Sequence, residues 1–166
     1  HSHEVPLLEQ HYGIDTAGLD VTFDLKTALF FATNQFVFLD KQKYIATYTP
    51  IPNGQHEGIV YCLVFRDPKI TKSRDKINQI GMFQHIPPVR PIRQSCAIPF
   101  FSEMEINATT TDLHTIFILD KDFDTKGLPK KEYLFPDIHR DPFYKALLDM
   151  KKKKPDIWGK IVEYKF

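Results

Sequence analysis

The apolar residues of this chain fall into short runs, and these runs follow two different periods. Segment 24–35 carries apolar residues at the helical spacing i, i+3, i+4 and i+7. These residues are Leu25, Ala28, Leu29 and Ala32. Because three phenylalanines, Phe30, Phe31 and Phe36, widen the apolar face, we expect a helix that is mostly buried.

The remaining apolar runs are mostly shorter and are typical of strands. The predicted strands cover 36–40, 43–49, 58–66, 79–84, 96–101, 114–120 and 161–166. Segment 58–66 is almost continuously apolar, so we expect a central strand. Further helices are predicted at 2–13, 130–136 and 141–153. The pattern predicts an α+β domain: a mainly antiparallel sheet of short strands, with helices near the N-terminal and C-terminal parts.

Size and composition favour one ordinary globular domain. The chain has 166 residues, of which 42% are hydrophobic and 26% charged. This length suits a single domain over 1–166 whose core needs no disulfide or metal. The formal net charge of +1 argues against a dedicated nucleic-acid binder, which needs clustered cations. The lysine run 151–154 is expected to be a solvated helix end, with a phosphate contact as the alternative.

Several classes of protein are excluded by what the sequence lacks. Cys62 and Cys96 are too few for a disulfide framework, and we expect buried free thiols. The histidines and cysteines show no zinc spacing, so no metal site is predicted. No run reaches the roughly 18 apolar residues that a membrane helix needs, and no signal peptide is visible. We therefore expect a cytoplasmic protein without membrane contact.

Three stretches carry polar residues among apolar ones in a fixed order. They are 8–16 (LEQHYGIDT) with 19–22 (LDVT) and 27–32 (TALFFA), then 90–98 (RPIRQSCAI), then 134–138 (LFPDI). This ordered set resembles the FRG domain, a bacterial and phage family named after an N-terminal Phe/Tyr-Arg-Gly motif. The resemblance spans residues 8–148, which is most of the chain.

The departures from the family pattern concern its polar site. The chain has Ala17 and Gly18 where the family has Arg and Leu, and Cys96 where it has Gly. The chain begins after the place that the Arg-Gly motif should occupy. The resemblance thus implies one FRG-like domain lacking its N-terminal Arg-Gly strand. If the family Arg at position 17 binds an anion, the site is altered or degenerate here.

A looser analogy connects this pattern with ADP-ribosyltransferases. Those enzymes have a small-hydroxyl loop before an Ala/Phe-rich helix, and a Glu or Gln on a late strand. By analogy, NAD is a possible substrate, and the catalytic candidates are Asp20, Thr22 and Gln94. They would act through preorganised electrostatics on an oxocarbenium-like sugar. The ligand-binding candidates are His11, Tyr12, Arg90 and Arg93.

The N-terminal candidates also have structural interpretations. His11 can cap the carbonyls of its own helix, with Gly13 ending that helix. Asp20 can organise its loop, since a partly buried carboxylate must be paired or hydrogen-bonded. Thr22 or Asp24 can cap the helix over 24–35.

The candidates near residue 90 leave similar alternatives. Gln94 can hydrogen-bond the core backbone or read a ligand. Pro91 argues against a regular helix between Arg90 and Gln94, so we expect entry to a strand there. Arg90 or Arg93 can also replace the positive charge that Ala17 lacks.

Two functions from different classes fit these residues. The first is an enzyme, or a degenerate form of one, that binds an NAD-like nucleotide and transfers an ADP-ribosyl group. The alternative is a non-catalytic recognition module for a protein or nucleic acid on the same fold. Under the first, we expect His11, Asp20, Thr22 and Gln94 to converge on one cleft.

Overall fold

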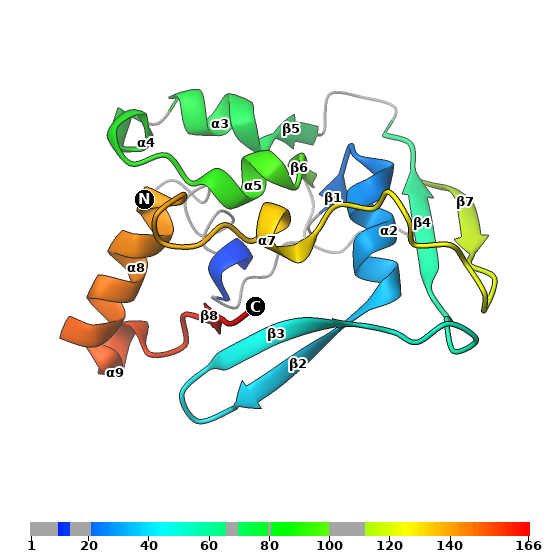
Figure 1. Ribbon diagram of the computed structural model, residues 1–166. Coiled ribbons are helices and arrows are strands. Elements are labelled where there is room, and N and C mark those ends of the chain that lie inside the picture. Colours follow the sequence, from blue (N-terminus) through cyan, green and yellow to red (C-terminus); the bar gives the residue numbers. More distant parts are fainter. Residues whose placement is uncertain (1–9, 14–20, 66–69, 80, 100–111) are drawn as a thin grey trace.

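The computed structural model describes residues 10–13, 21–65, 70–79, 81–99 and 112–166 (Figure 1). Its helices are η1 (Gln10–Tyr12, a 3-10 turn), α2 (Leu25–Thr33), α3 (Ser73–Gln79), α4 (Gly81–His85), α5 (Val89–Arg93), α7 (Lys131–Leu134), α8 (Pro142–Lys153) and α9 (Pro155–Trp158). Its strands are β1 (Val21–Thr22), β2 (Asn34–Asp40), β3 (Ile45–Pro50), β4 (Ile59–Leu63), β5 (Ile70–Lys72), β6 (Cys96–Pro99), β7 (Leu113–Ile118) and β8 (Glu163–Tyr164). These elements confirm the α+β class.

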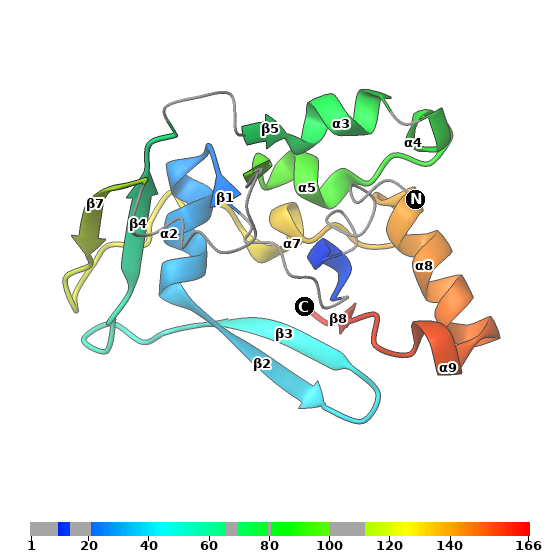
Figure 2. The ribbon, with the colours of Figure 1, turned by 180° about the vertical axis from the view of Figure 1, so that it is seen from behind.

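The strands form three small sheets, in the orders β1–β6–β5, β2–β3–β8 and β4–β7. Neighbouring strands run antiparallel except β3 and β8, which are parallel. The predicted predominance of antiparallel pairing is therefore confirmed. Figures 1 and 2 show the β2–β3 ribbon along one side of the molecule and α3, α5 and β5 along the opposite side, with η1 and α7 between them.

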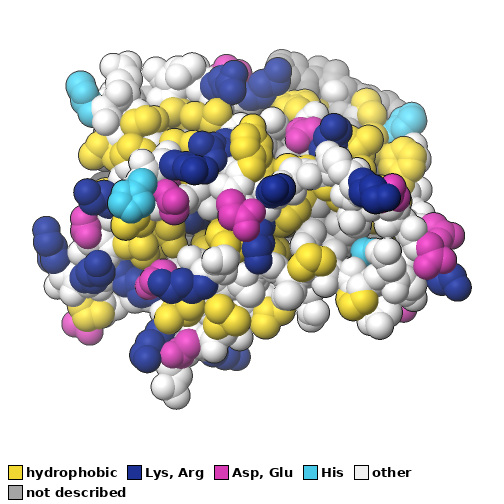
Figure 3. Space-filling model, in the orientation of Figure 1, with side chains coloured by type: hydrophobic (Ala, Val, Ile, Leu, Met, Phe, Trp, Pro, Cys, Tyr) yellow, Lys and Arg dark blue, Asp and Glu magenta, His cyan; other side chains and the backbone are white. Residues whose placement is uncertain are grey.

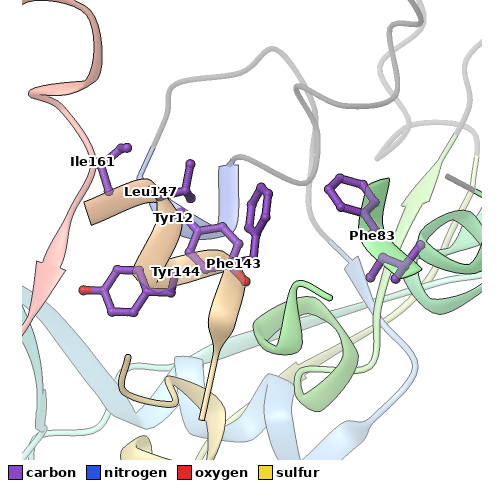
Figure 4. Close-up of a cluster of buried hydrophobic side chains, with 7 residues drawn as sticks. Tyr12, Phe83, Phe143, Tyr144, Leu147 and Ile161 are labelled. Carbon is purple, nitrogen blue, oxygen red and sulfur yellow. The ribbon is translucent and has the colours of Figure 1, made fainter. Parts of the chain in front are cut away.

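Two clusters of buried apolar side chains form the core. The larger one joins η1 to α3, α4, α8 and the chain before β8 (Figure 4). Its members are Tyr12, Ile77, Phe83, Phe143, Tyr144, Leu147 and Ile161. The smaller one consists of Phe30, Leu134 and Phe135, with Tyr48 and Tyr164 packed against it. Burying residues from both ends of the sequence closes the domain.

Helix α2 forms where the pattern predicts it, but its buried face differs. Asp24 is the N-cap, because its carboxylate accepts hydrogen bonds from the backbone N–H of Lys26 and Thr27, both at 3.2 Å. The buried side chains are Thr27, Phe30 and Thr33, whereas Leu25 is 61% exposed. The prediction of a mostly buried helix is wrong. Apolar residues occur on most sides of this helix, so the sequence pattern does not select one buried face. Packing against Leu134 and Phe135 selects the face that carries Phe30.

Two strand predictions need correction. Of the segment predicted as a strand over 79–84, Gln79 instead ends α3 and 81–84 belong to α4, where Phe83 is buried in the larger cluster; residue 80 lies outside the described residues. The segment predicted as a central strand forms β4, which among the described residues pairs with β7 alone. Helix α2 packs against one face of β4. Ile59 and Tyr61 lie on the other face and are 46% and 54% exposed.

The predicted C-terminal helices are confirmed as α7 and α8. Asp141 caps α8 by accepting a 3.0 Å hydrogen bond from the Tyr144 N–H, and Pro142 occupies the first turn. The predicted helix over 2–13 lies outside the described residues except for η1. The lysine run ends α8, but Lys151 is partly buried rather than fully solvated.

Candidate functional site

Residues His11 and Tyr12 are held in place by the way η1 ends. Gly13 has a φ of +93°, a conformation that favours glycine. A side chain there would collide with Val162. The close approach allows the Val162 N–H to donate a 2.9 Å hydrogen bond to the Tyr12 carbonyl. The C-terminal segment thereby fixes η1 inside the fold.

The side chains of His11 and Gln94 lie against each other in the interior. The Nδ1 atom of His11 is 3.1 Å from Oε1 of Gln94, and the Gln94 Nε2 donates a 3.1 Å hydrogen bond to the carbonyl of Leu134. Because the Gln94 oxygen can only accept, His11 carries its hydrogen on Nδ1. The Cys96 thiol lies 3.8 Å from that nitrogen.

Burial sets the charge state of this group. Burial is the main reason that the pKa of His11 falls to about 4; the Gln94 hydrogen bond opposes this shift, and the Arg90 charge adds to it. His11 is therefore neutral near neutral pH. A neutral imidazole supplies no positive charge to stabilise a Cys96 thiolate.

Thr22 joins the same region through strand pairing. It lies opposite Cys96 in the β1–β6 pair, and its hydroxyl donates a 2.7 Å hydrogen bond to the Gln94 carbonyl. The Thr22 hydroxyl oxygen also accepts a 3.0 Å hydrogen bond from the Asp24 N–H. Thr22 thus connects the entrance of α2 to the end of α5, and Asp24 is the cap.

Arg90 occupies the centre of an aromatic cage. Its side chain is fully buried, and its Nη1 donates a 2.9 Å hydrogen bond to the His11 carbonyl. The guanidinium carbon lies near the ring centroids of four aromatic residues. They are Tyr144 at 4.1 Å, Tyr12 at 4.6 Å, Tyr164 at 4.7 Å and Phe135 at 5.6 Å. Among the described residues, Nε and Nη2 have no hydrogen-bond acceptor, so the contacts of the guanidinium are mainly with aromatic rings.

A buried carboxylate completes the surroundings of this cage. Asp141 Oδ2 accepts a 2.7 Å hydrogen bond from the Tyr12 hydroxyl and a 3.3 Å one from the Arg90 backbone N–H. Burial and the Asp141 charge raise the pKa of Tyr12 well above its ordinary value. Sequence reasoning identified Asp141 only as the start of a helix. Its position before Pro142 signals a cap but not this contact.

The prediction that Pro91 prevents a regular helix between Arg90 and Gln94 is wrong. They lie in and directly after α5, where Pro91 stands in the first turn and its missing N–H costs no hydrogen bond. Arg93 lies apart from the buried group. Its Nη1 donates a 3.1 Å hydrogen bond to the Tyr133 carbonyl, and its guanidinium covers the Tyr133 ring.

The structure thus brings His11, Tyr12, Thr22, Arg90 and Gln94 together. Asp20 and Ala17 lie outside the described residues. The group joins all three stretches that carry the family resemblance. His11 comes from the first, Gln94 from the second, and the Leu134 carbonyl from the third.

Comparisons with protein-family models, curated proteins and solved structures give no match. Among the described residues, no three His, Cys, Asp or Glu side chains gather in a way that could hold a metal ion. Neither cysteine forms a disulfide; Cys96 is buried and Cys62 is partly buried. Within the same part of the chain, every helix is too short or too polar to cross a membrane.

Proposed function

We propose that this chain is an FRG-like, ADP-ribosyltransferase-like module in degenerate form, which binds an NAD-like nucleotide weakly and does not transfer its ADP-ribose. The observation that carries the proposal is the meeting of Thr22 and Gln94, 72 positions apart, beside His11. The analogy requires the hydroxyl loop and the late Glu or Gln to be neighbours. Pairing of β1 with β6 provides that arrangement.

The degenerate form is favoured by how the polar atoms are used. Both ends of the Gln94 amide are hydrogen-bonded within the protein, to His11 and to the Leu134 carbonyl. Arg90 is fully buried among aromatic rings, so its guanidinium is not accessible to a ligand phosphate. A phosphate-bearing ligand needs cations or free N–H groups, and the side chain of Ala17 carries no positive charge.

Calorimetric titration with NAD tests the binding. We expect a dissociation constant of about 0.1–10 mM, which corresponds to about 3–6 kcal/mol. Ala17→Arg restores the family cation and should tighten binding by about 5–30-fold, the scale of one charge-assisted contact. Thr125→Arg adds the same charge on an exposed turn and should leave the affinity unchanged. Sub-micromolar binding by the unaltered chain would refute the degenerate form.

The recognition module is the second candidate, and one observation favours it. On the β4–β7 pair, Ile59 faces Ile118 and Tyr61 faces Ile116, and all four side chains are 46% or more exposed. Such a contiguous apolar face is typical of a protein-binding surface. If neither the unaltered chain nor Ala17→Arg binds NAD, this second function is the better account.

A further inference from the structure

A cavity of about 650 Å³ lies between the β2–β3 turn, the end of α8, α9 and the start of β8. This volume is in the range of small-molecule sites. The cavity shares no lining residue with the His11–Gln94 group. Figure 3 shows Lys and Arg side chains gathered over the corner of the molecule where Figure 1 places α8 and α9.

One lysine in the cavity wall is held in a fixed position. The Lys151 Nζ donates hydrogen bonds of 2.8 Å to the Lys43 carbonyl and 2.7 Å to the Ile161 carbonyl. An ammonium group has three N–H donors, so one donor is left without an acceptor among the described residues. Lys151 is thus a positioned cation with a donor to spare.

The charge around this lysine is mainly positive. Four lysines line the cavity, namely Lys43, Lys151, Lys152 and Lys160, against two acids, Asp156 and Glu163. The Glu163 carboxylate is already paired, since its Oε1 lies 2.6 Å from the Lys165 Nζ. The Lys43 ammonium is paired as well, since it lies 3.4 Å from Asp40 Oδ2. Lys151 and Lys152 still outnumber Asp156 in the cavity wall, and this excess of positive charge favours a ligand with at least one negative charge.

The cavity also offers apolar contacts. Tyr44 and Ile45 line it from the β2–β3 side, and Ile157 lines it from α9 with 68% of its surface exposed. Covering that surface favours a ligand with an apolar or aromatic part. Lysine is a common ligand of phosphate groups, which it binds as a point charge.

We propose that this cavity binds a phosphate-bearing ligand, with the phosphate at Lys151 and Lys152 and an apolar part against Tyr44 and Ile157. The phosphate can belong to a soluble molecule or to a lipid headgroup. Both sources present the same charged group to the same lysines. The site is separate from the proposed nucleotide site.

Titration with inorganic pyrophosphate, followed by amide NMR, tests the site without NAD. We expect saturable shifts confined to residues 42–45 and 151–163. Lys152→Gln should weaken binding by about threefold, as expected for an exposed charge pair. Lys153→Gln is the matched control, because this exposed neighbour carries the same charge but does not line the cavity. Equal weakening by both variants, or no saturable shifts, would exclude a soluble phosphate ligand. It would overturn the whole proposal if vesicle binding also fails to distinguish Lys152→Gln from Lys153→Gln.

Phosphatidylcholine vesicles with and without phosphatidic acid distinguish the two sources. Co-sedimentation that needs phosphatidic acid and is lost in Lys152→Gln but kept in Lys153→Gln identifies a lipid phosphate. Pyrophosphate binding with that same discrimination, but without co-sedimentation, identifies a soluble ligand. If neither probe distinguishes the two variants, the site does not exist.

Discussion

The imidazole Nδ1 of His11 and the side-chain oxygen of Gln94 lie 3.1 Å apart in the interior, although 83 positions separate the two residues. This contact ties η1 to the end of α5, and Gln94 extends it to α7 through the Leu134 carbonyl. Residues that the family resemblance assigns to a ligand therefore also hold three segments together.

Stability should fall as the pH drops through the titration of His11. The pKa of His11 is about 4 in the folded chain and about 6.5 when exposed, so between these values the unfolded state binds more protons. The stabilisation is fully present above pH 6.5 and is lost towards pH 4. We expect His11 to account for a loss of about 3 kcal/mol.

Denaturant titrations at neutral pH and near pH 4 measure this loss. In His11→Gln the difference between the two pH values should shrink by about the same amount, since other groups titrate as before. His139→Gln, at an exposed site, should retain the full difference. An unchanged pH dependence in His11→Gln would show that His11 is already protonated or exposed.

Removing the Tyr12 hydroxyl should destabilise the fold. Tyr12→Phe deletes the 2.7 Å hydrogen bond to Asp141 and leaves a buried carboxylate with weaker support. We expect a loss of about 1.5–3 kcal/mol in the free energy of unfolding. Tyr133→Phe, whose ring is 53% exposed, should change it by less than about 0.5 kcal/mol. Equal effects of the two variants would count against the Tyr12–Asp141 contact.

Arg90 should matter for stability far more than Arg93 does. Arg90→Ala removes a fully buried side chain that contacts four aromatic rings, and we expect a loss of about 3–5 kcal/mol. Arg93→Ala removes a surface contact with Tyr133 and should cost less than about 1 kcal/mol. Thermal or denaturant unfolding gives both numbers. A loss below about 1 kcal/mol for Arg90→Ala would place its side chain outside the core.

The two apolar faces of α2 should respond differently to truncation. Phe30 is 4% exposed and packs against Phe135, so Phe30→Ala should cost about 3–5 kcal/mol. Leu25 is 61% exposed, and Leu25→Ala should cost less than about 0.5 kcal/mol. Denaturant titration of the two variants distinguishes the observed face from the one that periodicity suggests. The reverse order would mean that the helix is rotated.

Local signals in the sequence predicted much of the secondary structure. Asp24 and the apolar spacing after it predicted α2, and Pro155 marks the stop after the segment predicted as α8. These features depend on neighbours within a few residues. The choice of buried face on α2 depends instead on Phe135, more than 100 positions away, and periodicity carries no such information.

The sequence predicted which residues of the candidate site lie together, but not how deeply they are buried. The resemblance named His11, Thr22 and Gln94, and the structure brings them together. It gave no sign that Arg90 is buried, because the rings around it come from η1, the residue after α7, α8 and β8. Pro91 misled the prediction because a proline in the first turn of a helix is tolerated.

The release of nicotinamide from NAD tests the central proposal, that this module brings Thr22, Gln94 and His11 together but does not catalyse ADP-ribosyl transfer. The unaltered chain, incubated with NAD and followed by chromatography, should release nicotinamide no faster than buffer alone, because Gln94 and His11 are engaged with each other and His11 is neutral. Release above the buffer rate that disappears in Gln94→Ala, under conditions where this variant is shown to be folded, would contradict the account.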